Sequence, residues 1–151
     1  MSSDNATKAL IDSLNGLLAD YFALYLKTKN YHWHVTGPNF HDLHLLFDQQ
    51  SAELFALTDI IAERVRKNGG ATLTSIGVVQ AHSVIENDDR SGLAAADMIA
   101  SLRDDNAKLV ERIRAAKAAA STAGDNATEG MADDWTDEAQ KRVWFLSALL
   151  G

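Results

Sequence analysis

The most informative part of this sequence is residues 32–70, which read HWHVTGPNFHDLHLLFDQQSAELFALTDIIAERVRKNGG. A Gly-Pro pair at 37–38 can end one helix, and a Gly-Gly pair at 69–70 can stop the next. Between these breaks, apolar residues recur at the three- and four-residue spacing of an amphipathic helix. They are Phe40, Leu43, Phe47, Leu54, Leu57, Ile61 and Val65. The stretch therefore predicts a long helix over about 39–68.

Three further segments show the same periodicity. Apolar residues repeat at helical spacing over about 4–35, 91–120 and 128–150. Ser91 is a good N-cap for the second of these segments. The chain contains one proline, which favours long helices. Four long helices with one long crossover connection are typical of a four-helix bundle.

The long connection covers residues 71–90, where we expect a short extra helix at 77–81. A chain of 151 residues fits one domain. We therefore predict an all-α fold, a single domain over 1–151. It is a four-helix bundle with a short helix in the crossover loop between the second and third long helices.

Composition excludes several classes of protein. Hydrophobic residues make up 46% and charged residues 23% of the chain, which is usual for a folded domain and not for a disordered one. The absence of cysteine excludes disulfides and thiolate metal sites. No apolar run is long enough for a transmembrane helix, and the N-terminus lacks the pattern of a secretory signal. We expect a cytoplasmic protein with no membrane partner.

Two pairs of potential metal ligands lie in the helix predicted over 39–68. His44 and Asp48 are four residues apart, as are Asp59 and Glu63, so each pair points to one side of the helix. At about 100° per residue, all four fall within a sector of roughly 100°, beside the apolar stripe. Carboxylates on a helix face are usually just solvated. With two such pairs on one face, a metal site and a solvated helix face both stay open as interpretations at this point.

Distance along the helix decides how the two pairs can be used. Asp48 and Asp59 are 11 residues apart, which is about 16 Å of helix, whereas metal bonds are about 2.0–2.6 Å long. One straight helix therefore cannot bring both pairs to one metal. Two antiparallel copies about a two-fold axis can do so, because His44 and Asp48 of one chain then face Asp59 and Glu63 of the other.

His32 is the fifth candidate ligand. It extends the stripe of the first helix, and it lies near His44 if the first two helices are an antiparallel pair. Two imidazoles and three carboxylates suit Fe(II), Mn(II) or Zn(II). The remaining histidines are expected to be structural or exposed. They are His34, His41 and His82.

Short motifs extend this pattern over nearly the whole chain. They are His32-Trp33, Gly37-Pro38-Asn39-Phe40, Leu43-His44, Phe47-Asp48, Asp59, Ile61-Ala62-Glu63-Arg64, Gly124-Asp125-Asn126-Ala127-Thr128 and Trp144-Phe145-Leu146. The pattern resembles the Dps family, the ferritin-like mini-ferritins named as DNA-binding proteins from starved cells. The spacing of all five candidate ligands matches the metal site of that family.

The resemblance implies a ferritin-like bundle, assembled from two-fold dimers into a hollow dodecamer. It implies a ferroxidase that oxidises Fe(II), preferably with hydrogen peroxide and more slowly with oxygen, at a site for two iron ions. His32 would bind the tighter iron with Asp59 and Glu63 of the partner subunit, while His44 and Asp48 complete the weaker position. Fe(III) mineral would be stored in the cavity, protecting the cell from oxidative damage. Zinc or another divalent metal can replace iron on such ligands.

Two other roles follow from the resemblance. Trp33 directly follows a ligand, where the family places a tryptophan that donates an electron or traps a radical; the alternative is a packing role for this residue. The family also admits iron through acidic pores near the start of the last helix. The candidates here are Asp125, Glu129, Asp133 and Asp134. Gly130 stands where the family often has an acidic residue, and acidic residues at a helix start also favour the helix dipole.

DNA binding is the main alternative function, as a nucleoid protein with secondary iron binding. Members that bind DNA strongly often carry a Lys/Arg-rich tail, whereas this chain has a net charge of -7 and one basic residue, Lys8, in its first 26. DNA affinity comes largely from basic contacts to phosphate, so we expect weak or absent DNA binding. A third hypothesis is a metal-free helical shell, which the spacing of the five ligands disfavours.

Overall fold

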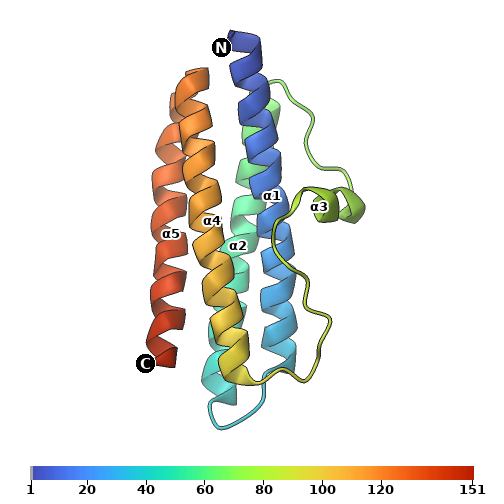
Figure 1. Cartoon of the computed structure of the whole chain (residues 1–151), viewed down its shortest axis with the longest axis vertical. Coiled ribbons are helices and arrows are strands. Elements are labelled where there is room, and N and C mark those ends of the chain that lie inside the picture. Colours follow the sequence, from blue (N-terminus) through green and yellow to red (C-terminus); the bar gives the residue numbers. More distant parts are fainter. Residues whose placement is uncertain (1) are drawn as a thin grey trace.

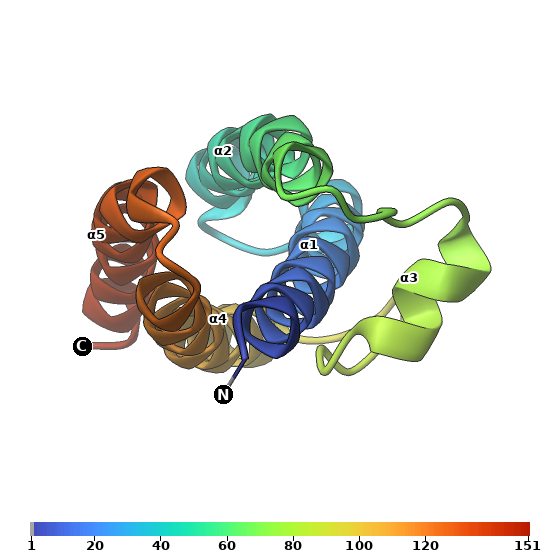
Figure 2. The ribbon, with the colours of Figure 1, turned by 90° about the horizontal axis from the view of Figure 1, so that it is seen from above.

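The computed structural model describes residues 2–151, which form five helices. The helices are α1 (Ser3–His34), α2 (Phe40–Lys67), α3 (Ile76–His82), α4 (Ala95–Ala123) and α5 (Asn126–Leu150). The four long helices lie side by side as a bundle, and α3 lies outside it against α1 (Figures 1 and 2). The connection that carries α3 runs back along the bundle, so α2 and α4 point the same way (Figure 1). The predicted all-α bundle with a crossover helix is confirmed.

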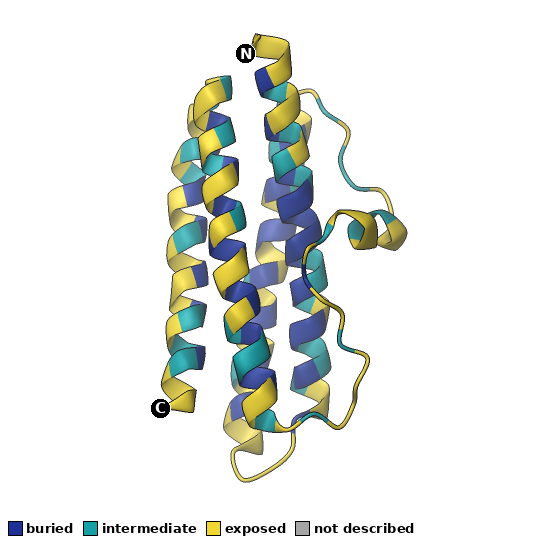
Figure 3. Ribbon diagram, viewed as in Figure 1, coloured by how far each residue is buried: buried dark blue, intermediate teal, exposed yellow. Residues whose placement is uncertain are grey.

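The core lies along the bundle axis, where each long helix turns its buried side inward (Figure 3). The apolar stripes predicted for the first two helices are buried, including Leu14, Leu24, Phe47 and Leu54. Phe40 is the exception: it is 42% exposed and stacks on His44. None of the helices in residues 2–151 has the length and apolar character needed to cross a membrane.

Three predicted helix boundaries are wrong. The third long helix begins at Ala95, after Ala94, instead of at Ser91, because the chain is still bent and extended through this stretch and Leu93 packs against the core. The same helix continues to Ala123 and ends on Gly124, whose φ of 74° is the left-handed C-cap conformation that glycine adopts at low cost. The last helix begins at Asn126, two residues earlier than predicted.

A buried carboxylate, Asp20, is one of the groups that hold the crossover connection to the bundle. Asp20 of α1 accepts hydrogen bonds from the backbone N–H of Val84 at 2.8 Å, from the Ser83 hydroxyl at 3.0 Å and from Arg112 Nε of α4 at 2.7 Å. Gly16, one turn earlier on α1, leaves space for this guanidinium, because a Cβ there would lie 2.5 Å from Arg112 Nη2. The connection therefore has a fixed path beside α1, close to the helix end that carries His32.

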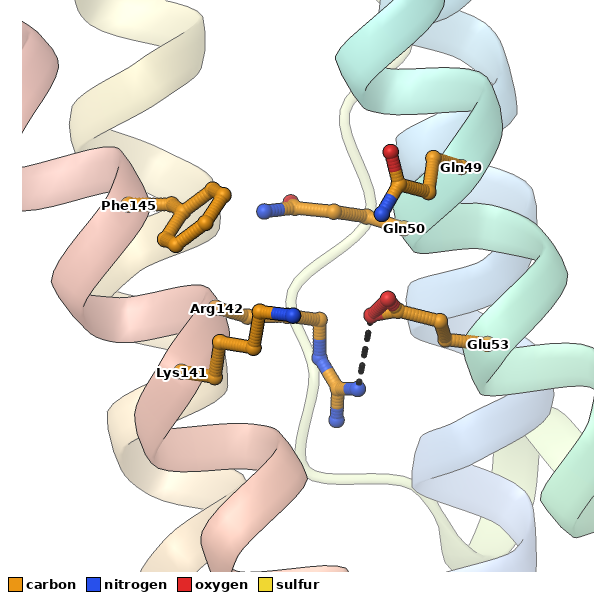
Figure 4. A pocket seen from close by; sticks show the side chains of 6 residues that line it. All are labelled: Gln49, Gln50, Glu53, Lys141, Arg142 and Phe145. Carbon is orange, nitrogen blue, oxygen red and sulfur yellow. Dashed lines mark ion pairs between the residues drawn. The ribbon is translucent and has the colours of Figure 1, made fainter.

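A second polar group lies between α2 and α5 (Figure 4). Arg142 is 1% exposed; its Nε donates to Asn106 Oδ1 at 2.7 Å, and its Nη1 lies 3.6 Å from Glu53 Oε1. The pocket beside it holds about 10 Å³, which is room for roughly one water molecule. Within residues 2–151 the Arg142 Nη atoms and the Tyr21 hydroxyl have no hydrogen-bond partner. This pocket is too small for a substrate, and we assign it no reaction.

Candidate metal centre

His32 and His44 form a reciprocal pair where α1 turns into α2. The turn uses Gly37, with a φ of 111°, and it folds the last turn of α1 against the first turns of α2. His32 Nδ1 lies 2.6 Å from the carbonyl oxygen of His44, and His44 Nδ1 lies 2.7 Å from that of His32. The rings stack with their centroids 3.9 Å apart. The turn between α1 and α2 places these two histidines together, as the sequence predicted.

This pairing determines which nitrogen of each ring carries the hydrogen. A carbonyl oxygen can only accept a hydrogen bond, so each Nδ1 must carry the hydrogen and donate it. In a neutral ring the other nitrogen, Nε2, then keeps its lone pair, which is the form that binds a metal. Backbone carbonyls that orient histidine ligands in this way are a common outer layer of metal sites. Both rings are half-buried, so their free nitrogens are oriented but accessible.

Asp48 lies one turn after His44 and beside His32. Its Oδ1 is 3.8 Å from His32 Nε2 and 2.6 Å from the ammonium of Lys29. The hydrogen bond from Lys29 lowers the pKa of Asp48; desolvation opposes this, and the charges of Lys29 and the two histidines add to the lowering. The carboxylate is therefore ionised and is held by a lysine that the sequence analysis did not single out. Lys29 lies three residues before His32, on the same helix face, and this spacing was the sign in the sequence that could have placed it at the site.

Asp59 and Glu63 lie farther along α2, away from the histidine pair. The helix is continuous from Phe40 to Lys67, so the distance along it keeps the two pairs of one chain from binding the same metal ion. Both carboxylates are exposed. Within residues 2–151, no three His, Asp or Glu side chains converge as a metal site in one chain. In a single chain His32 stacks on His44 and lies 3.8 Å from Asp48, but these side chains do not by themselves form a metal site, and Asp59 and Glu63 lie apart from them.

The face of α2 that carries these ligands is also apolar. Phe55 is 53% exposed and Leu45 is 52% exposed. At about 100° per residue, Phe55 falls between His44 and Asp48 around the helix, and Leu45 falls beside Glu63. On the neighbouring α1, Tyr25 packs against Phe55 with ring centroids 5.1 Å apart. Large apolar side chains exposed together on one face are typical of a protein–protein contact.

The other aromatic and histidine candidates are placed as follows. Trp33 is 59% exposed, on the surface next to His32. His34 Nδ1 contacts the backbone and side-chain oxygens of Asn30, His82 Nδ1 contacts the carbonyl oxygen of Val78, and His41 is exposed. Trp144 is 65% exposed, with an edge contact to Phe145, so it is not part of the core of the single chain.

The four pore candidates differ in their surroundings. Asp125 is the N-cap of α5: it accepts hydrogen bonds from Thr128, from Arg64 at 2.7 Å and from Asn68 at 2.9 Å. Burial raises the pKa of this carboxyl, but these hydrogen bonds outweigh burial and hold the pKa well below its usual range. Asp133 pairs with Lys117 of α4. The side chains of the candidates Glu129 and Asp134 take part in no ion pair among the described residues.

Comparisons with known proteins agree with the helical fold. The family model of the ferritin-like domain matches residues 11–151. The chain is 35% identical to the DNA protection during starvation protein of Brevibacillus brevis, over 91% of both chains. It is 30% identical to DNA protection during starvation protein 1 of Deinococcus radiodurans, over 95% of this chain and 69% of that one. The fold and sequence thus define a ferritin-like helical protein.

Solved structures narrow the class. The chain matches the crystal structure of a Dps protein from Bacillus brevis with a TM-score of 0.93 and 33% identity, covering 97% of this chain and 98% of that one. It matches Dps from Thermosynechococcus elongatus with a TM-score of 0.96 and 26% identity, covering 100% and 96%. The Dps of Vibrio cholerae, described as a ferritin-like diiron-carboxylate protein, matches with a TM-score of 0.92, 26% identity and coverage of 100% and 94%. This chain belongs to the Dps family.

Proposed function

We propose that this chain is a ferroxidase and iron-storage protein whose site is shared between two copies. The observation that carries the proposal is the reciprocal histidine pair, which leaves two metal-binding nitrogens beside Asp48. The same unbroken helix carries Asp59 and Glu63 about 16 Å farther along. Antiparallel contact of two such helices supplies both halves of two sites.

The exposed apolar face of α2 supports this mode of contact. An isologous dimer buries the same patch on both chains, and Phe55 and Leu45 lie on the face that carries the ligands. Burial of apolar surface provides the free energy of association at roughly 25 cal/mol per Å². The same contact brings Asp59 and Glu63 of the partner subunit toward His32. We propose that such dimers build the dodecameric shell.

The proposed chemistry uses Fe(II) as substrate. His32 and the carboxylates of Asp59 and Glu63 from the partner hold one ion, and His44 with Asp48 support a second. Carboxylates favour the harder Fe(III) product. Two neighbouring Fe(II) ions supply the two electrons that hydrogen peroxide needs to become water, so no hydroxyl radical is released. Stored Fe(III) inside a cytoplasmic shell then protects the cell from oxidative damage. The candidates for the iron entrance are Asp125, Glu129, Asp133 and Asp134.

The test of this function is an anaerobic titration of Fe(II) followed by peroxide. We expect two Fe(II) to be consumed per hydrogen peroxide, as measured by the absorption of Fe(III). We also expect a particle many times larger than the 16.4 kDa chain. A stable monomer that oxidises no iron would overturn the proposal. Replacement of Fe(II) by Zn(II) should block the same site, because zinc accepts the same ligands and is not oxidised.

Lys29 should weaken the second metal position. Its ammonium neutralises Asp48 at 2.6 Å and must give way when a cation binds there. A partly exposed ion pair is worth about 0.2–1 kcal/mol, so Lys29→Met should tighten metal binding at the second position by about two- to fivefold. Calorimetric Zn(II) titration measures this. Lys8→Met removes a comparable but remote ion pair with Asp12 and should leave both affinities unchanged; equal or weaker binding in Lys29→Met would contradict the role.

Binding of DNA as an architectural protein of the nucleoid remains the second candidate function, because the Brevibacillus and Deinococcus relatives are named as DNA protection proteins. The net charge of -7 opposes a phosphate backbone. We expect no electrophoretic shift of duplex DNA by the intact particle at physiological salt. A shift that withstands added NaCl would favour the DNA function instead.

A further inference from the structure

Tyr31 is a buried phenol next to a metal ligand. It directly precedes His32 in α1, so the two Cα atoms are about 3.8 Å apart. The Tyr31 side chain is 0% exposed, and its hydroxyl donates a hydrogen bond to Asp88 Oδ2 at 2.6 Å. Ser101 Oγ lies farther from the same hydroxyl, at 3.5 Å. The phenol thus combines a place next to His32 in the chain, isolation from solvent and a carboxylate that accepts its hydrogen bond.

The other two tyrosines lack this combination. Tyr21 is also 0% exposed, but its hydroxyl has no hydrogen-bond partner among the described residues. Tyr25 lies two turns before His32 and packs its ring against Phe55. Tyr25 is therefore a natural control, because it is a phenol on the same helix with no carboxylate bonded to its hydroxyl within residues 2–151.

Asp88 is prepared to receive a proton. Asp88 belongs to the crossover connection, and its backbone carbonyl accepts a hydrogen bond from Asn30 Nδ2 at 3.0 Å. Arg90 donates to both of its carboxylate oxygens, at 2.8 and 3.1 Å. Hydrogen bonds from Arg90 hold the pKa of Asp88 well below its usual range, so the carboxylate is ionised and can accept a proton. An oxidised phenol is a much stronger acid than a carboxylic acid, so even this carboxylate takes its proton.

A site that holds one Fe(II) needs a second source of electrons. Peroxide accepts two electrons when its O–O bond breaks, and one Fe(II) supplies only one. The Lys29–Asp48 ion pair competes with a metal ion at the second position, so the proposed centre is singly occupied when Fe(II) is scarce. We propose that Tyr31, with Asp88 as its proton acceptor, supplies the second electron when a single Fe(II) meets peroxide. This inference rests on the proposed ferroxidase function.

The step balances as follows. One electron passes from Fe(II) and one from Tyr31 to hydrogen peroxide, and two protons from solvent complete two water molecules. Fe(II) becomes Fe(III), the phenol becomes a neutral phenoxyl radical, and its proton moves to Asp88. A later Fe(II) returns one electron to the radical while Asp88 returns the proton, which restores Tyr31. The oxidising equivalent is held on a buried ring and is not released as hydroxyl radical.

Electron paramagnetic resonance tests the inference on the assembled protein. One Fe(II) per site is mixed with one equivalent of peroxide and frozen rapidly. We expect a tyrosyl signal in the wild type and in Tyr25→Phe, and its loss in Tyr31→Phe, with more spin-trapped hydroxyl radical. Asp88→Asn keeps an acceptor oxygen but cannot hold the proton, so the radical yield should fall there too. Tyr31→Phe keeps the Asp88–Arg90 contact, so the fold should survive.

The outcomes separate this inference from the function on which it rests. A full tyrosyl signal in Tyr31→Phe, a signal that disappears only in Trp33→Phe, or no protein radical in a wild type that still oxidises iron would each overturn the role of Tyr31 and leave the ferroxidase intact. If the Asp59→Ala/Glu63→Ala variant oxidised iron and formed the same radical as the wild type, the proposed site would fail, and the inference with it.

Discussion

Replacement of both Asp59 and Glu63 by alanine should lower the initial rate of peroxide-dependent Fe(II) oxidation by roughly 100-fold or more. Loss of a single outer contact to a metal ligand commonly costs about 10–100-fold in affinity or activity, and this variant removes two carboxylates that we propose as direct ligands of the tighter position. Both side chains are exposed in the single chain, so the fold should be unaffected. Stopped-flow absorption of Fe(III) measures the rate, and circular dichroism checks the fold.

A matched control separates the loss of ligands from the loss of charge. Asp104 and Glu111 are exposed carboxylates of α4, paired with Arg103 and Arg114. Asp104→Ala/Glu111→Ala removes the same negative charge from a different helix, outside the proposed set of ligands, and should oxidise iron at the rate of the wild type. Equal rates in both double variants would show that Asp59 and Glu63 are not ligands.

Lys27→Met should give the largest loss of stability. Lys27 of α1 and Asp105 of α4 form a buried ion pair at 2.8 Å, with side-chain exposures of 8% and 5%. Burial raises the pKa of Asp105, and the hydrogen bond from Lys27 opposes this rise. Removal of one partner of a buried pair costs about 3–5 kcal/mol, because the other charge is left uncompensated. The thermal midpoint, measured at fixed protein concentration, should fall by roughly 10 °C.

The exposed pair of Lys8 and Asp12 provides the control, since it is solvated on both sides. Lys8→Met should change the midpoint little, because exposed pairs contribute about 0–1 kcal/mol. Lys27→Met/Asp105→Leu removes both buried charges and should recover most of the lost stability. A Lys27→Met protein as stable as the wild type would show that the pair contributes nothing to folding.

The fold was predictable because its main determinant is periodic. Stripes such as Leu14, Leu24 and Leu54 repeat with the helix and are buried as expected. Helix ends depend on local contacts that periodicity does not contain. Ser91 has the chemistry of an N-cap, but packing of Leu93 delays the helix to Ala95.

The ligand set of the candidate site stays a prediction from the sequence, and the surroundings of these residues could not be predicted from it. The spacing along one helix separated the pair His44 and Asp48 from the pair Asp59 and Glu63, and α2 is continuous as that separation requires. The reciprocal histidine hydrogen bonds, the hold of Lys29 on Asp48 and the contact from Tyr31 to Asp88 join residues from different elements. Such contacts depend on side-chain geometry and on the path of the crossover connection, which the pattern of residue types does not specify.

Sharing of the site between two chains can be measured by complementation. One variant carries His32→Ala and His44→Ala, and the other carries Asp59→Ala and Glu63→Ala; each alone should be inactive. In a mixed dimer, one of the two sites receives both histidines and both carboxylates intact. Random pairing of equal amounts should therefore restore about a quarter of the wild-type oxidation rate, because half of the dimers are mixed and half of their sites are complete. Mixed assemblies no more active than either parent would contradict a shared site.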